Sequence, residues 1–169
     1  MRGPGDIAVA PISAAAFAPF GDLLSVDGVP DKLINQGLCG RFHDRARLDF
    51  GTGRAGISLF HADLRSLPMA LEMMERHPGG SQAFIPMDAA PFLVIVAPDE
   101  GGAPGTPQAF VTNDHQGVNF HRGTWHGVLT PIAGSGIFAV VDRIGAPGDP
   151  DPNLEEHWFD TPWRVVPGD

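Results

Sequence analysis

Most of the side chains that could bind a metal ion or move protons lie in two short stretches. The first, residues 75–86, places Glu75, His77 and Gln82 around a Pro-Gly-Gly turn. Side chains two positions apart in an extended chain share a face, so Glu75 and His77 should point the same way. The turn resets the register and lets Gln82 return to that face. Carboxylate, imidazole and carboxamide oxygen together are ligands suited to a borderline divalent ion.

The second stretch, residues 116–126, supplies two more histidines. Asn119 and His121 share a face of an extended chain, and Gly123 allows a reversal before His126. Two turns would therefore bring the polar side chains of both stretches to one concave wall. Histidine titrates near neutral pH, so His121 and His126 are candidates for proton transfer as well as for metal binding.

Each of these side chains also has a purely structural interpretation. His121 and His126 could be separate, partly buried histidines, and Glu75 with Arg76 could be a surface charge pair of small energetic value. Trp125 could belong to the core or line a pocket. Arg143, at the end of an apolar run, could be paired at the surface or could hold a substrate carboxylate.

Composition excludes several classes of partner. The net charge is −9 and Lys32 is the only lysine, which argues against nucleic acid and against anionic membranes as partners. A small anionic substrate remains compatible, because a few pocket arginines outweigh a distant net charge. The single cysteine, Cys39, indicates a reducing compartment, and neither a signal peptide nor a membrane-length apolar run is present. We therefore expect a cytoplasmic protein.

The 22 glycines and 17 prolines among 169 residues favour many turns and short strands over long helices. We expect a single domain, residues 1–169, that forms an all-β sandwich or closed barrel. Ser13 should cap a helical turn, residues 98–107 should form an exposed loop, and the aromatic tail 154–166 should pack onto the body or a partner. Residues 68–74 fit either a helix or a strand. The expected strands are 7–11, 21–26, 57–62, 83–86, 91–97, 108–112 and 137–143, of which 91–97 should be buried on both faces and 137–143 should be the final core strand.

The spacing resembles the two motifs of the cupin superfamily. Residues 75–82 are similar to the first motif, with Glu75 at the first histidine position and Gln82 at the acidic position. Residues 121–126 are similar to the second motif, with His121 at the usual proline position and His126 at the histidine ligand position. This resemblance implies a cupin-like double-stranded β-helix, a jelly-roll barrel, with a few short helices.

A closer resemblance covers nearly the whole chain. Residues 34–37, 41–44, 75–86, 117–126 and 141–143 look like segments of bacterial ureidoglycolate lyases. The resemblance implies a homodimeric enzyme that cleaves ureidoglycolate to glyoxylate and urea in the breakdown of allantoin, and that also carries the older label of a hydrolase. It implies as cofactor a divalent metal, nickel first with manganese or zinc as alternatives, or else a metal-free site.

The same resemblance implies roles for individual residues. The catalytic set is His77, Gln82, His121 and His126. The ligands, if a metal is present, are Glu75, His77, Gln82 and His126. The residues expected to contact substrate are Arg76, Phe84, Asn119, Arg122, Trp125 and Arg143. Two other functions stay open: another metal-dependent cupin enzyme, such as an isomerase or dioxygenase, and a non-catalytic sensor of a glyoxylate-like carboxylate.

Overall fold

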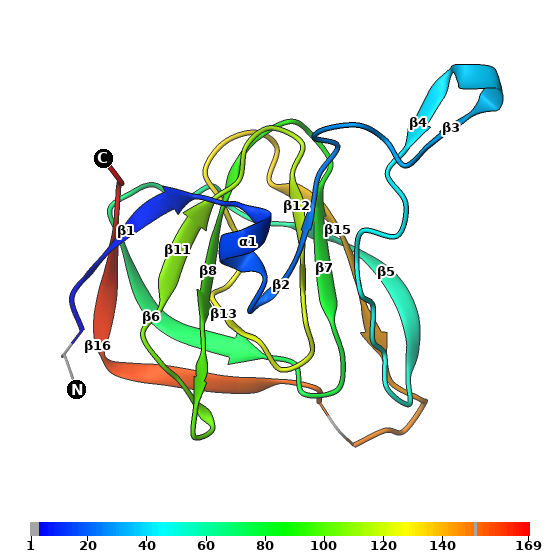
Figure 1. The fold of residues 1–169 in the computed structure, drawn as a ribbon. Helices are drawn as coiled ribbons and strands as arrows, with labels where there is room; N and C mark the ends of the chain where they lie inside the picture. The colour runs from blue at the N-terminus through cyan, green and yellow to red at the C-terminus, as the bar shows by residue number, and fades with distance from the viewer. Residues whose placement is uncertain (1–3, 151) are drawn as a thin grey trace.

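The computed structural model describes residues 4–150 and 152–169, and strands dominate it (Figure 1). The expected all-β, cupin-like barrel is confirmed. The elements, in chain order, are β1 (Asp6–Pro11), α1 (Ala14–Phe17), β2 (Gly21–Leu24), β3 (Lys32–Ile34), η1 (Asn35–Gly37), β4 (Cys39–Arg41), β5 (Arg54–His61), β6 (Met69–Arg76), β7 (Gln82–Pro86), β8 (Phe92–Ala97), β9 (Asp99–Glu100), β10 (Ala103–Pro104), β11 (Gln108–Val111), β12 (Gly117–Phe120), β13 (Trp125–His126), β14 (Thr130–Pro131), β15 (Ile137–Ile144) and β16 (Glu155–Val166).

A seven-stranded sheet closes on itself. Its order is β11-β1-β16-β6-β13-β8-β14, and β11 also pairs with β8, which completes a ring of six strands. Every strand of the ring contributes to one buried apolar cluster, which we call the inner cluster. Its members are Ile7, Leu71, Met74, Ile95, Ala97, Ala109, Trp125 and Val165. Closure leaves these strands with paired edges, so this sheet offers little backbone for association with other chains.

A five-stranded sheet in the order β2-β12-β7-β15-β5 packs against one side of this ring. The second apolar cluster, which we call the inter-sheet cluster, joins the two sheets and includes Phe84, Val94, Val96, Val118 and Val140. Strand β8 feeds alternate side chains to the two clusters, and all six of its residues are buried. The expectation that 91–97 is buried on both faces is therefore confirmed.

The short helix begins as the sequence indicates. The Ser13 hydroxyl accepts a hydrogen bond from the Ala16 amide at 3.2 Å and caps α1. Phe17 at its end is fully buried in the inter-sheet cluster. No helix in residues 4–150 or 152–169 is long and apolar enough to cross a membrane.

Three segments differ from, or sharpen, the sequence expectation. The ambiguous stretch 68–74 is strand, because β6 pairs with both β16 and β13. The predicted loop 98–107 contains a small hairpin, since β9 pairs with β10. The prediction that 137–143 is the final core strand is wrong, because β16 follows it and buries Val165 in the inner cluster. The tail packs onto the body, as expected. A register shift between Trp158 and Trp163 conceals the continuity of β16 in the sequence.

A substitution at Val165 can show whether the tail belongs to the core. It is fully buried in the inner cluster on the last strand. Val165→Ala should lower the free energy of unfolding by roughly 1–3 kcal/mol, because it removes two buried methyl groups and leaves a cavity. Chemical denaturation measures this effect, and Thr161→Ala, on an exposed position of the same strand, is the control. Equal stability of the two variants would contradict the assignment.

Candidate functional site

Glu75, His77 and His126 meet at one end of the barrel. Glu75 lies near the end of β6, His77 follows that strand directly, and His126 on β13 is the cross-strand neighbour of Glu75. Their potential ligand atoms all lie within 4.8 Å of one another. The two imidazole rings have centroids 5.2 Å apart. The fold thus brings three of the residues proposed from the sequence to one point.

Backbone carbonyls fix the tautomers of both histidines. His77 Nδ1 lies 2.8 Å from the Asn153 carbonyl oxygen, and His126 Nδ1 lies 2.9 Å from that of Gly127. A carbonyl oxygen can only accept, so each neutral ring carries its proton on Nδ1 and a lone pair on Nε2. Both Nε2 atoms are buried and have no hydrogen-bond partner among the described residues. This arrangement is typical of histidines that bind a metal through Nε2.

Electrostatics also favour a cation at this point. Complete burial, with the nearby His77, lowers the pKa of His126 to about 3 against the opposing hydrogen bond to Gly127. His126 is therefore neutral at physiological pH and suited to donate a lone pair. Burial raises the pKa of Glu75, with attraction from His77 opposing and repulsion from Glu156 adding to that effect. A bound cation would relieve the cost of ionising Glu75.

Gln82 faces the same region from the five-stranded sheet. It shares a strand face with the core residue Phe84, and its cross-strand neighbour Phe120 stacks on the His126 ring at 4.3 Å between centroids. Its Nε2 donates to Asp142 Oδ2 at 3.1 Å, whereas its Oε1 is buried and has no partner in the described part of the chain. Phe84 itself packs against Phe120 in the inter-sheet cluster, 5.8 Å between ring centroids.

His121 and Asn119 belong to a second polar cluster on the opposite face of β12. His121 Nε2 lies 3.0 Å from Asp22 Oδ2, and Asn119 donates to the same oxygen at 3.0 Å and to the Arg47 carbonyl. Partial burial raises the pKa of Asp22, but hydrogen bonds from Arg47, Asn119 and His121 outweigh it and leave the pKa below its usual value. These bonds tie β2 and β12 to the segment that carries Arg47.

Arg76 and Trp125 lie on the strand faces turned away from the histidines. The Arg76 guanidinium contacts Glu155 at 2.6 Å and Asp99 at 2.8 Å, and it lies over the Trp125 ring at 4.5 Å. The Trp125 indole N–H donates to Asp99 as well. The structure thus gives both residues protein partners, and their position next to motif residues reflects strand alternation.

Arg122 braces the turn that carries His77, and the Arg143 side chain lies beside the glycines of that turn. Arg122 Nη2 donates to the Gly79 carbonyl at 2.9 Å, and the buried Arg143 side chain donates to Asp149 at 2.9 Å. A Cβ atom at Gly79 would lie 2.6 Å from Asn153 Oδ1, and one at Gly80 would lie 2.6 Å from the Asp49 carbonyl oxygen. The turn therefore needs glycine at both positions because surrounding loops press against it.

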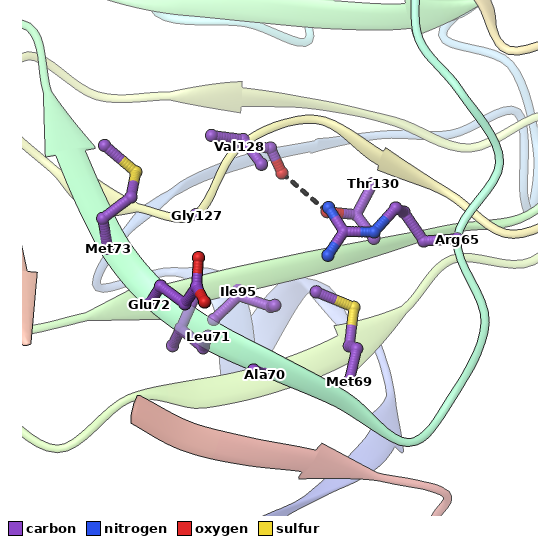
Figure 2. A pocket seen from close by; sticks show the side chains of 10 residues that line it. All are labelled: Arg65, Met69, Ala70, Leu71, Glu72, Met73, Ile95, Gly127, Val128 and Thr130. Atoms are coloured by element: carbon purple, nitrogen blue, oxygen red, sulfur yellow. Dashed lines mark hydrogen bonds between the residues drawn. The ribbon is translucent and has the colours of Figure 1, made fainter. Parts of the chain in front are cut away.

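A cleft elsewhere on the seven-stranded sheet lacks this chemistry. Figure 2 shows it between β6 and the segment around Gly127, with Met69 and Met73 along one side and Arg65 and Glu72 among its polar groups. Neither site histidine lines it. Its thioethers, apolar groups and single carboxylate offer no set of ligands for a hard or borderline metal.

Comparison with known proteins identifies the family of the chain. A family model described as ureidoglycolate lyase matches residues 5–166. The chain belongs to the ureidoglycolate lyase family.

Several named relatives cover almost the whole chain. It is 58% identical over 158 residues to a ureidoglycolate lyase of Rhodobacter capsulatus, and the aligned region covers 93% of this chain and 96% of the relative. It is 47% identical over 159 residues to ureidoglycolate lyase 2 of Rhizobium meliloti, covering 93% and 95%. It is 48% identical over 157 residues to a ureidoglycolate lyase of a Chelativorans strain, covering 92% and 93%.

In this member of the family, the site residues fit a divalent ion. Glu75, His77 and His126 converge, and Gln82, on the five-stranded sheet, contributes a buried oxygen that has no hydrogen-bond partner among the described residues. The sequence did not single out Asp142 or Asn153 as part of the site. Period-two alternation with the core residue Val140 could have indicated that Asp142 points inward. No local pattern indicates Asn153, because its contact with His77 spans 76 positions.

Glu75 yields a prediction about pH. In metal-free protein, the unfolded chain ionises Glu75 near its ordinary pKa, 4.5, and the folded chain ionises it only at higher pH. Stability is thus lost as pH rises from 4.5 through the folded pKa. Glu75→Gln removes this loss. The free energy of unfolding of the variant minus that of the wild type should therefore increase across that pH window and then level off. Denaturation across pH measures it, and Glu72→Gln, exposed on the same strand, is the control. A difference independent of pH would contradict the prediction.

Proposed function

We propose that this chain is a carbon–nitrogen lyase that cleaves ureidoglycolate to glyoxylate and urea, a reaction of allantoin and purine nitrogen catabolism. The observation that carries the proposal is the Glu75, His77 and His126 cluster, in which both histidines present buried Nε2 atoms without a partner among the described residues. The relatives named above are ureidoglycolate lyases by name, and they match this chain over more than nine-tenths of its length.

The reaction requires three events at one carbon atom. The hydroxyl group loses its proton, the bond from this carbon to the ureido nitrogen breaks, and that nitrogen gains a proton. The electron pair of the O–H bond becomes the carbonyl of glyoxylate, and the pair of the C–N bond leaves with urea. Water is not consumed, so the hydroxyl proton in effect moves to the leaving nitrogen.

We propose that the Nε2 atoms of His77 and His126, a carboxylate oxygen of Glu75 and Oε1 of Gln82 hold a divalent ion, with nickel as the first candidate and manganese or zinc as alternatives. Such an ion would act as a Lewis acid that favours ionisation of the substrate hydroxyl and stabilises the forming carbonyl. The low pKa of His126 suits binding rather than proton donation. Glu75 is the ionisable oxygen group of the cluster, and we assign to its second oxygen the transfer of the proton.

A product assay tests the proposed function. Purified protein with racemic ureidoglycolate, after incubation with nickel, manganese or zinc, should release glyoxylate and urea in equal amounts. Ammonia without urea would indicate a hydrolase instead. Bound iron with oxygen uptake would indicate a dioxygenase, and tight glyoxylate binding without turnover would indicate a sensor.

The site variant for the same assay is His126→Ala. It should lower kcat/KM by at least about 100-fold, because a ligand is lost and roughly 10–100-fold losses are typical even for residues that only orient ligands. Arg54→Ala, on the exposed edge strand β5, is a control that should retain activity. A loss of activity that merely parallels a loss of melting temperature would favour a structural role for His126.

We also propose that the chain acts as a homodimer, and that the segment 25–50 contributes to the interface. Its hairpin, β3 with β4, projects from the body and pairs only with itself among the described residues (Figure 1). Val29, Leu33 and Leu38 on this segment are 87%, 69% and 86% exposed. An isolated two-stranded hairpin is marginal in water, and exposed apolar groups of this kind favour burial against another chain.

Charge supports a second copy as the occupant. Lys32 and Arg41 are direct cross-strand neighbours, and like charges in that arrangement repel each other. A second copy, with 20 aspartate and glutamate residues, offers carboxylates that can pair locally with these two cations. Light scattering should give twice the chain mass of 17.9 kDa for the wild type. Leu33→Glu with Leu38→Glu should give a monomer, whereas Leu64→Glu, exposed on the body, should not. A wild-type monomer would refute the dimer.

We place the protein in the cytoplasm as part of this proposal. Cys39, the single cysteine, is free and exposed on β4. An exposed thiol persists best in a reducing compartment.

A further inference from the structure

Gln82 occupies the position at which the cupin motif carries an acidic ligand, and the one carboxylate of the proposed ligand set is instead Glu75, at the first histidine position. Its carboxamide is almost completely buried, with 5% of the residue exposed. One end of that group has a partner, Asp142, and the other end has none among the described residues. The orientation of the Gln82 amide decides whether its oxygen or its NH2 group is available to the histidines.

Asp142 determines the orientation of the Gln82 amide. Asp142 lies directly across from Gln82 on β15, and it shares a strand face with the core residues Val140 and Phe138. A carboxylate can accept hydrogen bonds but cannot donate them. It can therefore pair only with the NH2 end of the Gln82 amide, and the 3.1 Å contact from Nε2 to Oδ2 has this polarity. The oxygen end is thereby turned away from Asp142.

The direction in which that oxygen points is set by a row of three side chains. Phe120, Gln82 and Asp142 are cross-strand neighbours on β12, β7 and β15. Phe120 is the member that stacks on His126, so the row lies at the level of the imidazole. Of the buried polar atoms without a hydrogen-bond partner in the described residues, Gln82 Oε1, His77 Nε2 and His126 Nε2 belong to this end of the barrel. All three are lone-pair donors.

We infer that Asp142 is a positioning residue that orients the Gln82 carboxamide and places a negative charge one residue beyond the proposed ligand. Through the hydrogen bond, the Asp142 charge polarises the amide and makes Oε1 a stronger ligand. Glu75 and Asp142 then balance the two positive charges of the ion. The inference rests on the proposed metal site, and it assigns a role to a residue outside the ligand set.

Metal titration of metal-free protein tests this role without reference to turnover. The wild type should bind at least one of Ni²⁺, Mn²⁺ and Zn²⁺ in calorimetry. Asp142→Asn should weaken that binding by about 10–100-fold, the usual effect of losing a group that orients a ligand. A carboxamide at this position can pair with either end of the Gln82 amide, so the oxygen is no longer directed inward, and the charge is lost. Asp63→Asn, exposed and distant in sequence, changes the net charge equally and should bind as the wild type does.

A reciprocal variant separates orientation from simple damage to the fold. Gln82→Glu combined with Asp142→Asn exchanges the carboxylate and the carboxamide between the two strands. The amide now on β15 would donate to the carboxylate now on β7, whose second oxygen would face inward. This double variant should recover metal affinity to within about 3-fold of the wild type or exceed it, a difference of less than about 1 kcal/mol.

The measured affinities decide whether Asp142 orients Gln82 for metal binding. Equal affinity of Asp142→Asn and the wild type overturns it, as does a double variant no better than Asp142→Asn. A wild type that binds none of the three ions also overturns it. The product assay on the same preparations reports separately on the proposed reaction, so loss of the inference and loss of the proposed function give different results.

Discussion

The two-residue strand β13 is the point on which core and site both depend. It is held between β6 and β8 by backbone pairing, and its two side chains point to opposite faces. Trp125 enters the inner cluster and His126 meets Glu75 and His77. A shift of one residue in this pairing would exchange the two side chains. The burial of Trp125 therefore fixes the position of the imidazole, and hydrophobic packing supplies the accuracy that the site needs.

The electrostatic character of the site follows from its place inside the barrel. Burial makes protonation of His126 unfavourable and ionisation of Glu75 costly. The site is an assembly of buried lone pairs without hydrogen-bond donors among the described residues, which is the chemistry that a cation satisfies. The second polar cluster, around Asp22, has a carboxylate at its centre to which Asn119 and the Arg47 amide donate hydrogen bonds.

The sequence predicted the fold class, the convergence of Glu75, His77 and His126, and the double burial of β8, because each depends on local alternation and on motif spacing. It did not predict that Arg76 and Trp125 would contact Asp99 and each other, since both strand faces of a closed sheet are buried and either could have lined a pocket. The strand β16 was missed as a strand because Pro162 and a shift in register interrupt its pattern. Contacts such as those of Asn153 are set by chain topology, which no local pattern encodes.

The contact between His77 and Asn153 joins parts of the site that are made at different times during synthesis. Asn153 follows every other residue of the site in the chain, and it holds both His77 Nδ1 and the Gly79 amide. During synthesis, Glu75 and His77 leave the ribosome well before Asn153, the group that holds the His77 ring. The contact that holds Nδ1 of His77 therefore forms only after the segment that leads into β16 has been made.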